Sequence, residues 1–192
     1  MLLVSMGVSV DGFISDRDGA IDWSVPSDEL FAFHLERVGE LGAMLLGRRL
    51  YETMLVWETD PAMRRTAADA AFADTWAALP KVVFSRTLDA VQGTNTRLAA
   101  GTLEEELARL TQETGGDVEI GGADLAGQAF AQGLVDELRL FRGPAVLGGG
   151  TPLLPAVDRR VPLTLVEVRT FDQVIYERYR VARPPADRGG VS

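Results

Sequence analysis

The sequence contains no cysteine and only one histidine, His34, among its 192 residues. Without cysteine the chain can form no disulfide bond, no thiolate nucleophile and no cysteine-ligated metal site, and a single histidine excludes a multi-histidine metal site. We therefore expect no bound metal, and we interpret His34 as a solvated or capping histidine on a helix. The lack of cysteine also fits a reducing compartment, so we expect a cytoplasmic protein.

Basic residues and long apolar runs are scarce as well. The chain has 19 lysines and arginines against 28 aspartates and glutamates, a net charge of -9, which argues against nucleic acids and anionic membranes as main partners. The apolar run from Met1 to Val10 is too short to span a bilayer and has no basic segment, which indicates a buried first strand and not a signal peptide. A phosphate-bearing ligand would therefore depend on a few well-placed arginines.

The residues that are present suit one globular domain. Hydrophobic residues make up 46% of the chain, and no internal repeat or long linker divides it. Strand-like and helix-like segments alternate through most of the chain, which predicts a mostly parallel sheet with helices on both faces. Two segments, 163–171 and 173–181, alternate as strands and predict an antiparallel pair at one edge. The other expected strands are 2–10, 43–47, 81–85, 96–99, 117–120 and 135–143, and the expected helices are 28–40, 48–54, 60–78, 102–116 and 123–132.

One joint between a predicted strand and a predicted helix carries two glycines, Gly121 and Gly122, in the stretch "IGGADLAG". The N-terminus of a helix has unpaired backbone N–H groups and a partial positive charge, and glycine lets a phosphate approach that backbone closely. The spacing differs from the G-x-G-x-x-G fingerprint of dinucleotide-binding folds. The joint therefore indicates either a pyrophosphate site or a tight turn that needs a positive φ.

Two further strand ends carry arginine. The stretch "MLLGRRLYE" places Arg48 and Arg49 in the first helical turn after Gly47, where cations oppose the helix dipole unless an anion binds. The stretch "VVFSRT" ends a strand with Ser85 and Arg86, whose hydroxyl and guanidinium can both bind phosphate. The alternatives are arginines paired with surface acids and an ordinary polar strand end. Because ligands of open α/β sheets sit at the carboxyl ends of the strands, the three strand ends together favour a ligand with more than one phosphate.

Five motifs in this order resemble the dihydrofolate reductase-like family: "SVDGFIS" with "IDW", "LLGRRLYETM", "KVVFSRTL", "IGGADLA" and "LGGGTPLL". The branch they resemble most is the C-terminal reductase domain of the bifunctional riboflavin-biosynthesis deaminase/reductase. The sequence has no deaminase-like segment, so we expect a stand-alone member, with a reductase domain over 1–181 and a disordered tail over 182–192.

The resemblance implies an α/β fold, a three-layer α/β/α sandwich with a central mixed, mostly parallel sheet and an antiparallel C-terminal edge. It implies NADPH as the hydride donor, a small-molecule substrate and a homodimer. The C-terminal strands, with Phe141, Tyr176 and Tyr179, are a candidate for the dimer contact.

The resemblance also assigns the cofactor residues by their position in the matching motifs, whereas the substrate and proton-donor candidates are residues near the expected cleft. The residues expected to bind the cofactor are Ile14, Gly47, Arg48, Arg49, Ser85, Arg86, Ile120, Gly121, Gly122, Ala123 and Leu125. The loop 11–23 resembles the flexible loop that covers the nicotinamide. The residues expected to bind the substrate are Asp11, Trp23, Gly148 and Gly149. The candidates for a catalytic proton donor are Asp11, Tyr51 and Glu52.

Several of these candidates have a structural alternative. Asp11 begins an Asp-Gly turn, Glu52 can pair with an arginine one helical turn before it, and Trp23 can belong to the core. The loop 147–154 either closes the cleft opposite the lid or is a long turn.

Dihydrofolate reductases carry an acid on the first helix that holds the pterin, and here Asp28 and Glu29 can instead serve the helix dipole. The resemblance, together with the three strand ends, implies an NADPH-dependent reductase of a small heterocyclic, pterin- or aminopyrimidine-like, or carbonyl substrate. The alternative is a non-catalytic dinucleotide-binding or sensing module on the same fold.

Overall fold

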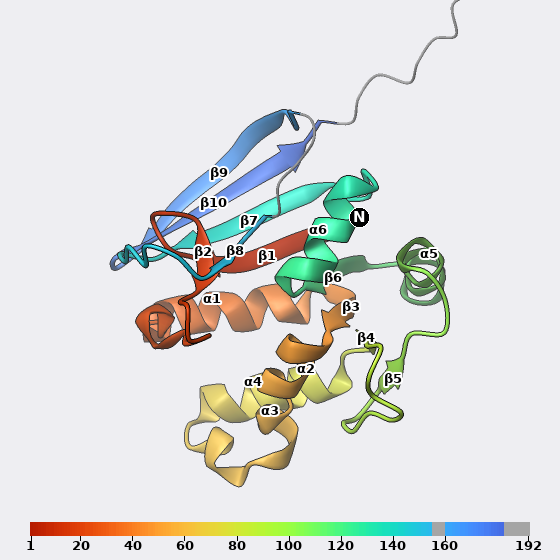
Figure 1. The fold of residues 1–192 in the computed structure, drawn as a ribbon. Coiled ribbons are helices and arrows are strands. Elements are labelled where there is room, and N and C mark those ends of the chain that lie inside the picture. Colours follow the sequence, from red (N-terminus) through yellow and green to blue (C-terminus); the bar gives the residue numbers. More distant parts are fainter. Residues whose placement is uncertain (155–159, 183–192) are drawn as a thin grey trace, which may run out of the picture.

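The computed structural model describes residues 1–154 and 160–182 (Figure 1). The strands are β1 (Leu2–Val8), β2 (Phe13–Ser15), β3 (Leu41–Gly47), β4 (Lys81–Phe84), β5 (Thr96–Leu98), β6 (Asp117–Gly121), β7 (Glu137–Arg142), β8 (Thr151–Pro152), β9 (Leu163–Phe171) and β10 (Val174–Val181). The α-helices are α1 (Asp28–Gly39), α2 (Arg48–Met54), α3 (Val56–Thr59), α4 (Ala67–Ala78), α5 (Leu103–Thr114) and α6 (Ala123–Ala131). Two short 3₁₀ helices are η1 (Asp22–Ser24) and η2 (Pro61–Arg64).

Eight strands form one mixed sheet in the order β5-β4-β3-β6-β1-β7-β10-β9. All pairs from β5 to β7 are parallel, whereas β10 is antiparallel to both β7 and β9. The mostly parallel sheet with an antiparallel C-terminal edge is therefore confirmed. Because the parallel strands point the same way, the carboxyl ends of β4, β3, β6, β1 and β7 meet at one edge.

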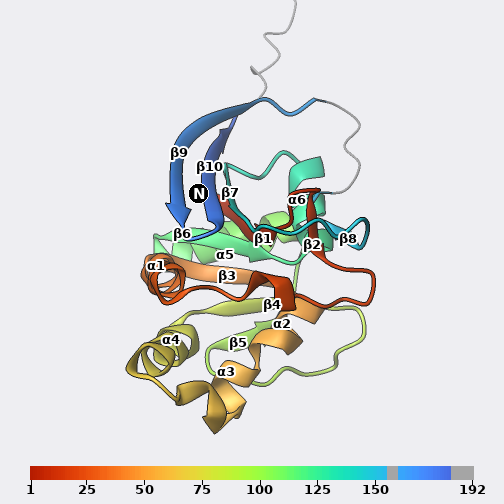
Figure 2. The same ribbon diagram turned by 90° about the vertical axis from the view of Figure 1, so that its left-hand side faces the viewer.

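Helices cover both faces of the sheet. Successive side chains of a strand point to opposite faces, so the apolar strands give each face a surface that helices bury. Leu45 and Ile120 lie in a core shared with α5 and α6, whereas Met44 and Leu46 lie in a core shared with α1, α2 and α4. Figure 2 shows α1 and α4 on one side of the sheet and α6 on the other. The result is the three-layer α/β/α sandwich.

Most local expectations hold, and the differences have simple reasons. The helix expected at 60–78 is divided into η2 and α4, because Thr66 forms a capping box with Asp69 and starts a new helix. The small sheet of β2 and β8 was not expected, since strands of two or three residues carry no periodic pattern. The tail predicted at 182–192 lies, apart from Ala182, outside the described residues. None of the helices within the described ranges is long and apolar enough to cross a bilayer.

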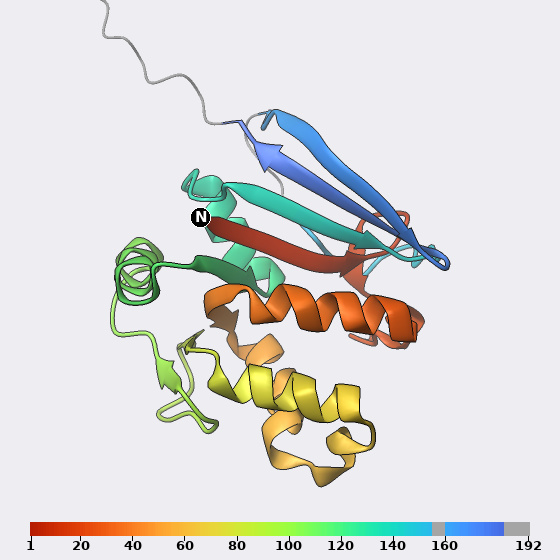
Figure 3. The same ribbon diagram turned by 180° about the vertical axis from the view of Figure 1, so that it is seen from behind.

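The C-terminal strands differ from the expected dimer contact. Phe141 and Tyr176 are buried and pack with Phe33 of α1, so their placement at a dimer surface is wrong. Tyr179 is half-buried against the core under α5 and α6. Figure 3 shows β9 and β10 as a long pair at the edge of the sheet. The homodimer itself stays a prediction.

Glu119 of β6 is a half-buried carboxylate in register with Leu3 and Met44. Burial raises the pKa of Glu119 from 4.5 to about 7, and Arg139 opposes the rise. A carboxyl whose folded pKa exceeds its unfolded pKa loses stability as pH rises through that interval. We expect Glu119→Gln to be more stable than wild type by about 1–3 kcal/mol at about pH 8 and similar to it at about pH 4.

Urea unfolding of both proteins at several pH values measures this difference. The matched control is Glu104→Gln, which changes an exposed carboxylate in the first turn of α5. A Glu119→Gln variant whose stability keeps the wild-type dependence on pH would contradict the assignment.

Candidate functional site

Five loops meet at the carboxyl edge of the sheet, where ligands of parallel α/β sheets bind (Figure 1). The residues after which these loops begin are Val8, Gly47, Phe84, Gly121 and Arg142. The edge therefore brings together all three strand ends that the sequence analysis selected.

The loops after β3 and β6 touch through glycines. A Cβ atom placed on Gly122 would lie 3.5 Å from the Cα of Gly47. Gly122 has a φ of 104°, which favours glycine, and a side chain on Gly121 would collide with Leu50 of α2. The turn explanation is therefore correct for Gly122, and close packing accounts for Gly121. Because Gly47 and Gly122 have no side chains, neither residue covers the backbone N–H groups at the start of α2 and α6.

The helices that begin at these two joints are uncapped. Within the described chain, no side chain caps the N-terminus of α2 at Gly47 or of α6 at Gly122. By contrast, Ser27, Thr66 and Thr102 cap the N-termini of α1, α4 and α5. Backbone N–H groups of the first turn need partners, and anions are favoured there. The contact between the loops therefore places two helix N-termini with anion-binding capacity side by side.

The two arginines after Gly47 have different surroundings. Arg48 forms an ion pair with Glu52, with Nη1 3.2 Å from Oε1, on the exposed face of α2. The alternative interpretation of Glu52 as an ion-pair partner is thus confirmed. Because the pairing favours the ionised carboxylate, it argues against Glu52 as a catalytic proton donor. Arg49 is exposed and forms no ion pair with any described residue. Arg49 is therefore the free cation at this N-terminus.

At the third strand end, after β4, Ser85 has a structural role and Arg86 is unpaired among the described residues. The Ser85 hydroxyl accepts hydrogen bonds from the backbone N–H groups of Thr87 (3.1 Å) and Leu88 (3.0 Å), so it stabilises its own turn. Arg86 is exposed, and its guanidinium has no carboxylate partner in the described residues. Arg86 remains available to a ligand, and Ser85 holds the turn that presents it.

Asp11 fastens two loops together. Its carboxylate accepts hydrogen bonds from the Ser9 hydroxyl (2.7 Å) and from the backbone N–H groups of Leu147 (3.1 Å) and Gly148 (2.7 Å). These contacts, that of Ser9 first, lower the pKa of Asp11 from 3.8 to about 2. A carboxyl with that pKa is ionised at neutral pH, which argues against Asp11 as a proton donor. Its contacts favour a loop clamp.

Asp11→Asn should loosen this clamp. The amide keeps the shape but loses the charge, so we expect the backbone N–H groups of Leu147 and Gly148 to exchange with solvent at least about tenfold faster. Hydrogen exchange measured by NMR tests this. Asp18→Asn is the matched control, because Asp18 lies in the same loop and its carboxylate holds no described backbone N–H. Equal protection in Asp11→Asn and wild type would contradict the clamp.

The predicted lid is held by more than Asp11. Strands β2 and β8 pair antiparallel, with Ser15 opposite Thr151. Arg17 donates from Nη2 to the Gly148 carbonyl oxygen at 2.7 Å, and a side chain on Gly150 would collide with Ser15. The run Gly148 to Gly150 thus lets the two loops approach each other. Gly148 and Gly149, expected to bind substrate, support the lid in this structure.

An open hollow of about 600 Å³ lies between the lid and α2. The residues that line it are Asp16, Arg17, Asp18, Gly19, Arg49, Gly150 and Thr151. Sequence reasoning selected Arg49 but missed Arg17, because the flanking aspartates gave that stretch the character of an ordinary polar loop. Arg49 and Arg17 therefore line the same hollow, together with Asp16 and Asp18.

Tyr51 is not in the cleft, so its role as a proton donor is wrong. Its side chain is 7% exposed and packs in the core shared with α4. The hydroxyl accepts a hydrogen bond from the Gln92 N–H at 2.7 Å and donates to the Gln92 carbonyl oxygen at 3.3 Å. Tyr51 therefore anchors the loop after β4.

Four of the expected cofactor residues have limited access. The side chains of Ile120 and Leu125 are buried in the core under α6, and Ile14 packs against the same core. Ile120 is also paired with strands on both sides, so of these residues only Leu125, in the first turn of α6, has a backbone N–H that could face a ligand. Ala123 is half-buried at the start of α6, beside the glycine joint.

Trp23 and His34 lie on the face of the sheet that α1 covers, opposite the face that packs against α6. The ring of Trp23 lies 3.1 Å from a Cβ atom placed on Gly143, and its buried indole N–H finds no acceptor among the described residues. The His34 ring centroid is 4.3 Å from that of Phe141. The interpretation of His34 as a solvated or capping residue is therefore wrong, because it packs inward from the middle of α1.

Comparison with known proteins identifies related sequences. The family model described as the RibD C-terminal domain matches residues 1–176. The chain is similar to the uncharacterized protein YyaP of Bacillus subtilis (strain 168), with 29% identity over 186 residues that cover 91% of this chain and 93% of YyaP.

Solved structures share the fold. A putative riboflavin biosynthesis protein from Shewanella sp. PV-4 has a TM-score of 0.74 and 24% identity, covering 95% of this chain and 99% of that one. A dihydrofolate reductase from Enterococcus faecalis, complexed with NADP(H) and RAB-propyl, has a TM-score of 0.61 and 18% identity, covering 95% and 97%. These identities are low, so the two structures support the fold.

Proposed function

Because this chain belongs to the RibD C-terminal domain family, we propose that it is an NADPH-dependent reductase of a small heterocyclic, pterin- or aminopyrimidine-like, or carbonyl substrate. Two proteins of similar fold are described as a putative riboflavin biosynthesis protein and as a dihydrofolate reductase complexed with NADP(H). The observation that carries the proposal is the contact between two uncapped helix N-termini at Gly47 and Gly122. Such a pair suits a pyrophosphate.

The free arginines on either side fit a dinucleotide phosphate. The first-turn N–H groups after Gly47 and Gly122 would hold the pyrophosphate. Arg49 and Arg86, both exposed and unpaired among the described residues, would hold the remaining phosphate at the ribose. NADPH has such a 2′-phosphate and NADH does not, so this arrangement favours NADPH.

The chain contributes orientation and exclusion of water. NADPH supplies the hydride when it is bound. The loop 11–23, held by Asp11 and by the pairing of Ser15 with Thr151, would act as the lid over the bound nicotinamide and limit access of water. Tyr51 is buried, Glu52 is ion-paired and Asp11 is strongly acidic. We therefore propose that the proton for the atom beside the new C–H bond comes from solvent at the cleft mouth.

A spectrophotometric assay of NADPH oxidation tests the proposal. The substrates to compare are dihydropterins, aminopyrimidines and small carbonyl compounds. Oxidation that depends on one of these classes supports a reductase. If NADPH binds but no class is reduced, the protein is better explained as a dinucleotide-binding or sensing module.

A further inference from the structure

The loop 85–95, between β4 and β5, carries Arg86, whose guanidinium is unpaired among the described residues. The loop contains turns and bends but no helix or strand. Holding such a segment still costs conformational entropy, so contacts that order it before a ligand arrives improve the affinity of the groups that it carries. Two of these contacts come from the helical segment 48–59, which lies far from the loop in sequence.

Tyr51 of α2 holds the loop at Gln92. Its hydroxyl accepts a hydrogen bond from the Gln92 N–H at 2.7 Å and donates one to the Gln92 carbonyl oxygen at 3.3 Å. Both contacts use backbone atoms of Gln92, so they do not depend on its side chain. Within the described chain, no other residue of α2 forms a hydrogen bond with this loop.

Glu58 of α3 holds the loop two residues farther on. Its Oε2 accepts a hydrogen bond from the Thr94 N–H at 2.6 Å, and its Oε1 lies 3.4 Å from the Nζ of Lys81. Both charged side chains are buried, and moving either one out would leave the other charge without its partner. Gly93 makes the contact possible, because its φ is 99° and a Cβ atom placed on it would lie 3.1 Å from Oε1 of Glu58.

Apolar contacts extend this anchoring towards Arg86. Leu88 and Val91 pack against the same core as Tyr51. At the start of the loop, the Ser85 hydroxyl accepts two backbone N–H groups of its own turn. The backbone that carries Arg86 is therefore held on one side by the end of β4 and on the other by the contacts with α2 and α3.

We propose that Tyr51 is a positioning residue for Arg86: its hydroxyl holds the loop so that the guanidinium meets the 2′-phosphate of NADPH, and it thereby contributes to a preference for NADPH over NADH. The inference rests on the proposed function, which assigns that phosphate to Arg49 and Arg86. A loop released at Gln92 would have to be ordered when the cofactor binds, and only a cofactor with the 2′-phosphate pays that cost. Tyr51 is itself buried, so it acts through the loop.

Tyr51→Phe tests the role of the hydroxyl. The variant keeps the ring in the core, so it should fold. By calorimetry we expect NADPH to bind about three- to tenfold more weakly and the affinity for NADH to stay within about twofold. Gln92→Ala is the matched control, because it keeps both backbone groups and should leave both affinities at the wild-type values. If Tyr51→Phe does not fold, Gly93→Ala, which crowds Glu58, takes its place with the same expected result.

A double variant separates positioning from general support of the fold. If Tyr51 acts through Arg86, adding Tyr51→Phe to Arg86→Ala should change the affinity for NADPH no further, within about twofold. A hydroxyl that only stabilised the protein would affect NADPH and NADH alike, and its loss would add to that of Arg86.

The wild-type protein gives a reciprocal test. If the contact at Gln92 favours binding of NADPH, bound NADPH must favour that contact by the same factor. We therefore expect saturating NADPH to slow hydrogen exchange of the Gln92 N–H, followed by NMR, by at least about threefold, and NADH to slow it less.

Three results would overturn the inference although NADPH binds the wild-type protein. They are an unchanged ratio of NADPH to NADH affinity in Tyr51→Phe, additive losses in the double variant, and equal exchange of the Gln92 N–H with either dinucleotide. Each of them leaves the proposed function standing. A wild-type protein that does not bind NADPH would instead remove the proposed function and, with it, this inference.

Discussion

Replacing Glu106 with Gln is expected to lower the free energy of unfolding by about 2–4 kcal/mol. For a chain of this length that corresponds to a fall in Tm of roughly 5–15 °C. Glu106 of α5 is fully buried, yet it is charged. Its carboxylate therefore depends completely on the partners that surround it.

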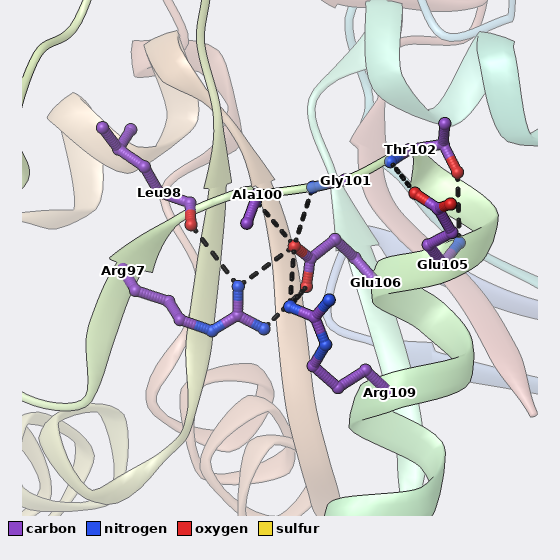
Figure 4. A network of polar contacts seen from close by, with 8 residues as sticks. All are labelled: Arg97, Leu98, Ala100, Gly101, Thr102, Glu105, Glu106 and Arg109. Carbon is purple, nitrogen blue, oxygen red and sulfur yellow. Dashed lines mark hydrogen bonds and ion pairs between the residues drawn. The ribbon is translucent and has the colours of Figure 1, made fainter.

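Those partners come from β5, from the segment between β5 and α5, and from α5 itself (Figure 4). The Arg97 guanidinium donates two hydrogen bonds, 3.1 and 2.6 Å long, and the backbone N–H groups of Ala100 and Gly101 donate at 2.7 and 3.2 Å. Arg109 adds an ion pair at 3.3 Å. A glutamine cannot satisfy all these donors, so buried N–H groups lose their acceptor. Because Arg97 and Arg109 are partly exposed, water hydrates their charges and limits the loss.

The dependence on pH gives this prediction a second readout. The hydrogen bonds of Arg97, and then those of the backbone, lower the pKa of Glu106 from 4.5 to about 2. Its contribution is thus complete above about pH 4.5 and is lost as pH falls towards 2. The difference in stability between wild type and Glu106→Gln should therefore shrink over that interval.

Glu105→Gln is the matched control, because Glu105 lies one residue earlier and its side chain accepts the Thr102 N–H of the capping box (Figure 4). Glutamine serves equally well at that position, so little change is expected. Urea unfolding of the three proteins makes the comparison. Equal stability of Glu106→Gln and wild type would show that the network contributes nothing to the fold.

Arg49→Ala and Arg86→Ala are each expected to weaken NADPH binding by about 10–100-fold. Both guanidiniums are exposed, and neither pairs with an acid in the part of the chain that the structure describes. Their loss should leave stability nearly unchanged, since no described contact is broken. Arg86→Ala, at the end of β4, should have little effect on the affinity for NADH, because NADH lacks the 2′-phosphate. Calorimetric titration measures both affinities.

Two control variants separate a site from a general effect of charge. Arg64→Ala removes the same charge from η2, where Arg64 pairs with Asp74. Arg48→Ala removes the arginine that pairs with Glu52 and should affect NADPH less than Arg49→Ala does. If all four variants bind NADPH equally, Arg49 and Arg86 do not bind phosphate.

The sequence predicts the three strand ends well, because their chemistry depends on local order. Glycine, arginine and serine stand next to predicted strands, and a parallel sheet must bring such ends together. The glycines show the limit of this reasoning. Gly121 and Gly122 are required by packing against Leu50 and by a positive φ, and neither reason can be distinguished from ligand binding in a sequence.

Side-chain direction explains the errors among the proposed catalytic residues. Tyr51 and Glu52 are neighbours in sequence but point about 100° apart on a helix, so one is buried and the other exposed. The role of Asp11 depends on Leu147 and Gly148, more than a hundred residues away. The sequence around His34 indicates only its place on a helix, whereas the environment of its ring depends on contact with Phe141 of β7. Contacts of this kind have no local pattern.

Calorimetric titration of the wild-type protein with NADPH and with NADH tests the central claim most directly. The paired helix N-termini at Gly47 and Gly122 and the free arginines predict binding of NADPH at a Kd of roughly 1–100 μM, with NADH at least about tenfold weaker. If neither dinucleotide binds, the carboxyl edge of this sheet is not a dinucleotide site, and the proposal of an NADPH-dependent reductase is wrong.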